Sequence, residues 1–77
     1  MAEQGVRAVF AASVRRERLA RGWSCDELAG RSGVSKGTVV NVEFQRCGTT
    51  LDVAVLLAEA LGTTIGALAG EREAARG

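Results

Sequence analysis

Apolar residues recur at helical spacing along most of the chain, and glycines interrupt the pattern. Val6, Phe10 and Val14 recur every four residues, which predicts one apolar face of a helix. Val9 lies beside that face, and the helix is expected to end near Gly22. Four more helices follow: a short one after Ser24, then helices over about Lys36–Phe44 and Leu51–Leu61, then a brief one through Ile65 and Leu68. The pattern predicts an all-α, five-helix fold.

A residue suited to capping precedes each of the later helices. Ser24 and Glu27 have the spacing of a capping box, in which each side chain bonds the other's free backbone N–H. Ser35, Thr50 and Thr64 stand before the next three helices. Two residue pairs have the spacing of a hydrophobic staple, Trp23 with Leu28 and Val34 with Val39. These local signals therefore set where the helices are expected to begin.

Seventy-seven residues allow one small domain, expected over residues 1–70 with a polar tail over 71–77. Hydrophobic residues make up 47% and charged residues 25%, as in ordinary globular domains. With no histidine and only Cys25 and Cys47, the chain lacks the side chains for a usual zinc site or a Cys-His pair. We therefore expect no metal, no cofactor and no catalytic activity.

Cysteine usage and hydropathy bear on the compartment. Two cysteines are too few for a disulfide framework, so we expect both to be reduced. No apolar run approaches the roughly 20 residues that span a membrane, and the first residues do not resemble a signal peptide. The sequence therefore predicts a cytoplasmic protein that does not bind membranes.

The net charge of +1 is unevenly distributed. Residues 1–22 hold five arginines against two glutamates, whereas residues 49–77 have a net charge of −2. A basic N-terminal half is consistent with a nucleic-acid surface but is also typical of an ordinary solvated helix. Charge alone does not decide between them.

The more informative unit is the pair of short helices on either side of Gly33. Ala29 is small enough to let two helices approach closely, and Gly33 permits the positive φ of a sharp turn. Val39 and Val42 can anchor the second helix to the core. This order of small, turn and apolar positions favours a helix-turn-helix, at about residues 25–44, over a generic helical hairpin.

At these residues the chain resembles the Xre/Cro-type repressor family of helix-turn-helix DNA-binding domains. The resemblance covers about residues 6–69, most clearly in Arg21-Gly22-Trp23-Ser24, Asp26-Glu27-Leu28-Ala29, Gly33-Val34-Ser35 and Ala58-Glu59-Ala60-Leu61-Gly62. Three positions depart from the family. Cys25 replaces its usual glutamine, Gln45 its glycine and Thr49 its proline. We therefore expect one phosphate contact to be lost and the loop after the third helix to differ in shape.

Arg18 and Glu43 are expected to form a structural ion pair. Each lies four residues after a valine on an inward-facing stripe, Arg18 after Val14 and Glu43 after Val39. Two charges that point at a core are tolerated when they meet, and the family resemblance implies a pair at these positions. Glu17 lies near the same stripe and could compete for an arginine.

The outward face of the third helix is the expected DNA-reading surface, because the N-terminal end of such a helix enters the major groove. The resemblance implies the same base-reading positions, which are Lys36, Gly37, Val40 and Asn41. Lys36 can donate to guanine or a phosphate, and Asn41 can pair with adenine. Ordinary solvated helix surface is the alternative interpretation.

Phosphate contacts are expected around that surface, from free N–H groups at two helix starts and from nearby side chains. The residues assigned to them are Ser24, Cys25, Ser35, Thr38, Gln45 and Arg46. Cys25 would lie close to DNA, where a redox-sensitive thiol is one interpretation and a simple space-filling residue the favoured one.

The fourth helix is apolar nearly all round, which suggests burial on both sides. One face, expected to pack on the first three helices, contains Leu51, Ala54, Val55, Ala58 and Leu61. The second face is assigned to a two-fold homodimer interface made of Val53, Leu56, Ala60, Ile65 and Leu68. Coverage by the fifth helix and tail of the same chain is the alternative.

The sequence thus predicts a transcriptional regulator, a minimal repressor or controller, that binds a palindromic double-stranded DNA operator as a homodimer. The alternative keeps the fold but makes the chain an antitoxin or adaptor whose main partner is another protein. The low net charge and the few polar residues on the reading helix favour that alternative to a degree.

Overall fold

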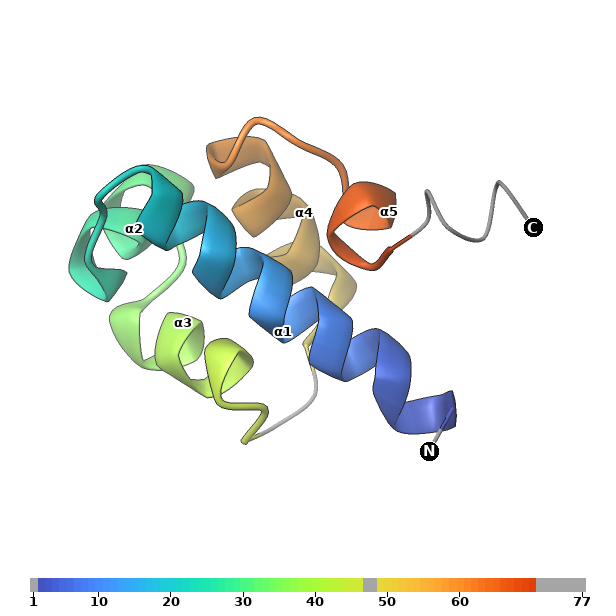
Figure 1. The fold of residues 1–77 in the computed structure, drawn as a ribbon. Helices are drawn as coiled ribbons and strands as arrows, with labels where there is room; N and C mark the ends of the chain where they lie inside the picture. Colours follow the sequence, from blue (N-terminus) through green and yellow to red (C-terminus); the bar gives the residue numbers. More distant parts are fainter. Residues whose placement is uncertain (1, 47–48, 71–77) are drawn as a thin grey trace.

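The computed structural model describes residues 2–46 and 49–70, and within these the chain forms helices and no strands. The polar tail 71–77 and Cys47 lie outside the described residues. The helices, shown in Figure 1, are α1 (Ala2–Ala20), α2 (Cys25–Ser32), α3 (Lys36–Glu43), α4 (Leu51–Ala60) and α5 (Ile65–Leu68). The prediction of an all-α, five-helix fold is confirmed.

The four predicted caps are present. The side-chain oxygens of Ser24, Ser35, Thr50 and Thr64 each accept a hydrogen bond from the backbone N–H three residues later. The capping box at Ser24 is only half as expected, because the Glu27 carboxylate accepts from Arg31 Nε at 2.9 Å. Each of these four helices therefore begins with one hydrogen bond from a backbone N–H to the side chain of its N-cap residue.

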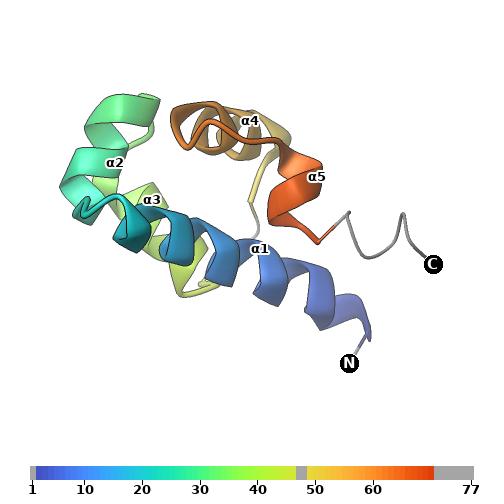
Figure 2. The same cartoon turned by 45° about the horizontal axis from the view of Figure 1, so that its top comes forward.

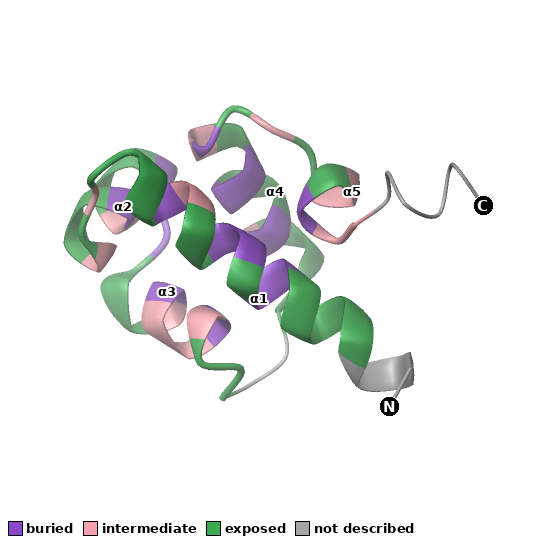
Figure 3. Ribbon diagram, viewed as in Figure 1, coloured by how far each residue is buried: buried purple, intermediate pink, exposed green. Residues whose placement is uncertain are grey.

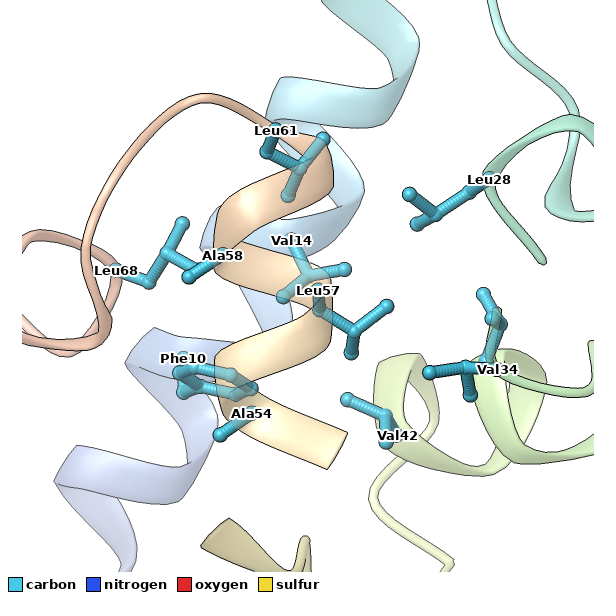
Figure 4. Packing of buried hydrophobic residues seen from close by; sticks show 11 residues of the cluster. Phe10, Val14, Leu28, Val34, Val42, Ala54, Leu57, Ala58, Leu61 and Leu68 are labelled. Atoms are coloured by element: carbon cyan, nitrogen blue, oxygen red, sulfur yellow. The ribbon is translucent and has the colours of Figure 1, made fainter. Parts of the chain in front are cut away.

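The helices enclose one apolar core (Figure 4). α1 packs against α3 and α5, α2 packs against α3 and α4, and α5 also packs against α4. The turned view in Figure 2 shows α1 lying across the other helices. The largest fully buried side chains are Leu28, Leu57, Leu61, Leu68, Val14 and Val39. Buried and exposed positions alternate along the longer helices (Figure 3), and α5 contributes Leu68 to the core.

The apolar stripe of α1 is buried only in its central part. Phe10 and Val14 belong to the core, but Val6, expected on the same face, and Val9, expected beside it, are exposed. The N-terminal end of α1 extends past the other helices in both views (Figures 1 and 2), so little lies against it. Val6 instead lines an open groove with Leu51 and Ile65.

The predicted inward face of α4 is partly wrong. Leu51 is 72% exposed and Val55 is also exposed, whereas Leu57, which was assigned to neither face, is completely buried. The buried residues are Ala54, Leu57, Ala58 and Leu61. Because nearly every position of this helix is apolar, the spacing fits several faces, and packing against α2 and α5 selects one.

One residue of the predicted dimer interface is also misplaced. Leu68 is 2% exposed and lies in the same cluster as Ala58 and Leu61 (Figure 4), because α5 folds back onto α1 and α4. Val53, Ala60 and Ile65 are half-buried against this core, which leaves Leu56 as the exposed member of the set. Leu68 is therefore a core residue and not part of an interface.

Candidate nucleic-acid interface

The turn between α2 and α3 has the tight geometry that the sequence predicts. Gly33 has φ +81° and donates its N–H to the Ala29 carbonyl at 2.9 Å. The buried Ser32 hydroxyl accepts from the Val34 N–H at 3.2 Å, which ties the two sides of the turn together. A residue with a Cβ is disfavoured in this left-handed conformation. The turn thus sets the angle at which α3 leaves α2.

α3 presents one face to the core and its N-terminal edge to solvent. Val39 and Val42 are buried, as their spacing predicts. The four positions assigned to base contacts are brought together on the other side, where Lys36 and Gly37 are exposed and Val40 and Asn41 are half-buried. Val40 and Asn41 therefore have less free surface than the N-terminal pair.

The residues assigned to phosphates lie at both ends of this surface. Ser24 and Ser35 are exposed, but their hydroxyls already accept capping bonds from Glu27 and Thr38. Ser35 Oγ also donates to Thr38 Oγ1 at 2.8 Å. The first backbone N–H groups of α2 and α3 have no partner within their helices and are the donors suited to an anion.

Cys25 is less available than expected. Its side chain is half-buried and packs against the apolar core at the start of α2. Its backbone N–H remains at the helix N-terminus, where a phosphate could approach. Any contact from this residue would therefore come from the main chain.

α3 ends in a Schellman-type turn at Gln45, the position where the resemblance implies glycine. The Gln45 N–H donates to the Val42 carbonyl and the Arg46 N–H to the Asn41 carbonyl. Gln45 has φ +57°, the one positive φ among the described non-glycine residues. Its side chain and that of Arg46 are exposed, and the Arg46 guanidinium lies 5.7 Å from the centre of the Phe44 ring. Both residues follow directly on the C-terminal end of α3, and Gln45 also lines the groove that contains Val6, Leu51 and Ile65.

Arg18 of α1 and Glu43, the last residue of α3, form an ion pair between the two helices. Arg18 Nε and Nη2 donate to the two Glu43 carboxylate oxygens at 2.7 and 3.0 Å, and Nη1 donates to the Trp23 carbonyl at 2.8 Å. The hydrogen bonds that Arg18 donates to Glu43 raise the pKa of Arg18 above its ordinary value, against the opposing effect of burial. Glu17, the possible competitor, instead accepts from Arg21 at 2.8 Å. The pair ties the end of α3 to α1 and to the turn before α2.

The structure also adds a contact at the surface that the sequence did not predict. Lys36 Nζ lies 3.5 Å from Asp26 Oδ2, which connects the first turns of α3 and α2. Asp26 also lies in the first turn of α2, where a negative charge interacts favourably with the helix dipole. Asp26 and Lys36 lie ten positions apart in the sequence and on different helices. Their spacing does not predict a contact unless the angle between α2 and α3 is known.

The described residues contain no cluster of three or more metal-ligating side chains. Nor is any described helix long and apolar enough to cross a membrane.

Comparison with known proteins gives consistent matches. A family model described as helix-turn-helix matches residues 14–68. A hypothetical transcription factor of Neisseria meningitidis serogroup B (strain ATCC BAA-335 / MC58) is 40% identical over 60 residues, which are 78% of this chain. The chain spans 57% of the length of that curated relative.

Two solved structures share the fold. The crystal structure of the Neisseria hypothetical transcription factor NHTF superposes with a TM-score of 0.81 at 36% identity, covering 95% of this chain and 87% of that one. The clp gene regulator ClgR of Corynebacterium glutamicum superposes with a TM-score of 0.74 at 26% identity, covering 92% and 79% of the two chains.

Proposed function

The chain belongs to the Xre/Cro-type helix-turn-helix family, and we propose that it is a sequence-specific, double-stranded DNA-binding transcriptional regulator that uses α3 in the major groove. The observation that supports this most directly is the exposed N-terminal edge of α3, held by the turn at Gly33 and by the Arg18–Glu43 pair. A rigid helix with a free N-terminal edge is what major-groove docking requires.

Base contacts in this proposal come from four residues of α3. Lys36 donates to guanine O6 and N7, and Asn41 pairs with the N6 and N7 atoms of adenine. Val40 touches a thymine methyl, and Gly37 lets the backbone approach the base edges closely. Since two of these residues are polar and Asn41 is half-buried, each domain is expected to discriminate only modestly between sequences.

Phosphate contacts position the helix. We assign them to the free N–H groups at the starts of α2 and α3, near Ser24, Cys25 and Ser35. Thr38, Gln45 and Arg46 add side-chain contacts. Arg46 is the exposed cation of this group and lies in the turn that ends α3.

We further propose that the domain, residues 1–70, acts as a two-fold homodimer on a palindromic operator. Leu51, Val55 and Leu56 are exposed on α4, and an exposed apolar patch is typical of an interaction site. A two-fold dimer can place two recognition helices about 34 Å apart, on one side of the DNA. Joining two weak contacts would offset the modest readout of each.

Selection of bound duplexes from a random pool tests the proposed function. We expect an enriched palindrome with two half-sites one helical turn apart, and affinity that falls steeply between about 50 and 200 mM salt. No enriched sequence, together with co-purification of a protein partner, would instead support the adaptor or antitoxin alternative.

A further inference from the structure

The contact between Asp26 and Lys36 places a carboxylate beside a residue proposed to bind DNA. Lys36 is the first residue of α3, and Asp26 is the second residue of α2. Their charged atoms lie 3.5 Å apart, and the side chains are 59% and 71% exposed. Both groups therefore lie at the edge of the surface that would meet DNA.

Few cations serve this surface. Over residues 35–46 the basic side chains are Lys36 and Arg46. Of the nearby carboxylates, Glu43 is paired with Arg18 and Glu27 with Arg31, so Asp26 is the one in contact with Lys36. Asp26 of α2 therefore offsets the charge of Lys36, one of the two cations of α3 and its final turn.

That neutralisation affects two kinds of DNA binding differently. Binding to arbitrary sequence depends almost wholly on cations that meet phosphates and release counterions. Binding to an operator adds hydrogen bonds to base edges, which can compensate for separating Lys36 from Asp26. Because the pair is exposed, it is weak enough to open when such a contact is offered.

Building on the proposed function, we propose that Asp26 is a specificity-determining residue, which holds Lys36 away from phosphates and so weakens binding to arbitrary DNA more than binding to the operator. Asp26 acts through Lys36 and touches no base. Its position in the first turn of α2 also stabilises that helix, a separate role that alone would leave the dependence of DNA binding on salt unchanged.

The test compares Asp26→Asn with Asp52→Asn, which removes the same charge from the exposed first turn of α4. Dissociation constants are measured for the selected operator and for a random duplex of equal length, from 50 to 200 mM salt. We expect Asp26→Asn to bind the random duplex about 5-fold more tightly and to steepen the slope of log K against log salt by about 0.9. The operator should gain less, so the ratio of the two affinities falls.

A second variant isolates the route through Lys36. In a Lys36→Met background, Asp26→Asn should change binding to the random duplex no more than Asp52→Asn does. Equal effects of Asp26→Asn and Asp52→Asn in the wild-type background would overturn the inference, as would an Asp26→Asn effect that persists without Lys36. If the wild-type protein selects no DNA at all, the proposed function fails first, and that result is distinct from either of these.

Discussion

The Arg18 guanidinium and the Glu43 carboxylate, 25 residues apart, form a two-pronged ion pair with side chains only 10% and 3% exposed. Removing one partner would leave the other charge buried without compensation. The pair therefore couples the position of α3 to the folding of the whole domain.

We expect Glu43→Ala to lower the free energy of unfolding by about 3–5 kcal/mol, measured by urea denaturation. Glu27→Gln is the control, because its exposed pair with Arg31 should contribute about 0–1 kcal/mol. Replacing both partners by apolar residues, Arg18→Met with Glu43→Leu, should restore much of the loss. A loss in Glu43→Ala no larger than in the control would contradict a buried pair.

Gln45 adopts a left-handed backbone at φ +57°, a conformation that costs a non-glycine residue about 1–2 kcal/mol. We expect Gln45→Gly to raise stability by about 0.5–1 kcal/mol, since the relieved strain exceeds the added freedom of the unfolded chain. The reciprocal change, Gly33→Ala at φ +81°, should lower stability although no atom beyond the adjacent residues lies within 4 Å of the new methyl group. Thermal melts of both variants measure the change in melting temperature. Shifts of the same sign in the two variants would contradict the prediction.

Asn41 and Arg46 should differ in how they affect DNA binding. Asn41→Ala is expected to relax base preference at one position of each half-site, at about 1–3 kcal/mol of discrimination. Arg46→Ala should weaken binding to all sequences alike and reduce the salt slope by about 1. Repeated selection with each variant makes the comparison, and uniform loss in Asn41→Ala would remove Asn41 from the base-contacting set.

The pKa of Glu17 lies below its ordinary value of 4.5, chiefly because Arg21 donates a hydrogen bond to it. A carboxyl group whose pKa falls on folding stabilises the native state above its unfolded pKa and loses that contribution as the pH drops through the folded value. Glu17→Gln should therefore be slightly less stable than wild type at pH 7, by about 0.5 kcal/mol, and equal to it once the pH is below the lowered pKa of Glu17 in the folded protein. A stability difference between the two proteins that stays constant as the pH falls from 7 would show that the Glu17 charge does not contribute to it.

Leu56 is the exposed member of the predicted dimer interface. We expect wild type to sediment at micromolar concentration as twice its 8.0 kDa mass, and Leu56→Glu as a monomer with unchanged helical content. Leu19→Glu is the matched control, because Leu19 is also exposed but lies on α1. Wild type sedimenting as a single 8.0 kDa species would rule out the dimer at that concentration.

The starts of α2 to α5 could be predicted from sequence because each depends on residues close by in the chain. Ser24, Ser35, Thr50 and Thr64 bond the backbone three residues on, a distance that chain geometry sets before any packing occurs. The turn at Gly33 is local in the same sense. The resemblance, which spans most of the chain, also identified the helix-turn-helix.

The sequence by itself therefore determined the five helices, their caps and the buried valines of α3, since each depends on chain geometry or on one clear apolar stripe. Tertiary structure decided which face of α4 is buried, because an almost wholly apolar helix fits its neighbours in several rotations. It also placed Leu68 in the core and set Asp26 against Lys36. Those contacts depend on the angles between helices, and no periodicity within one helix encodes an angle to another.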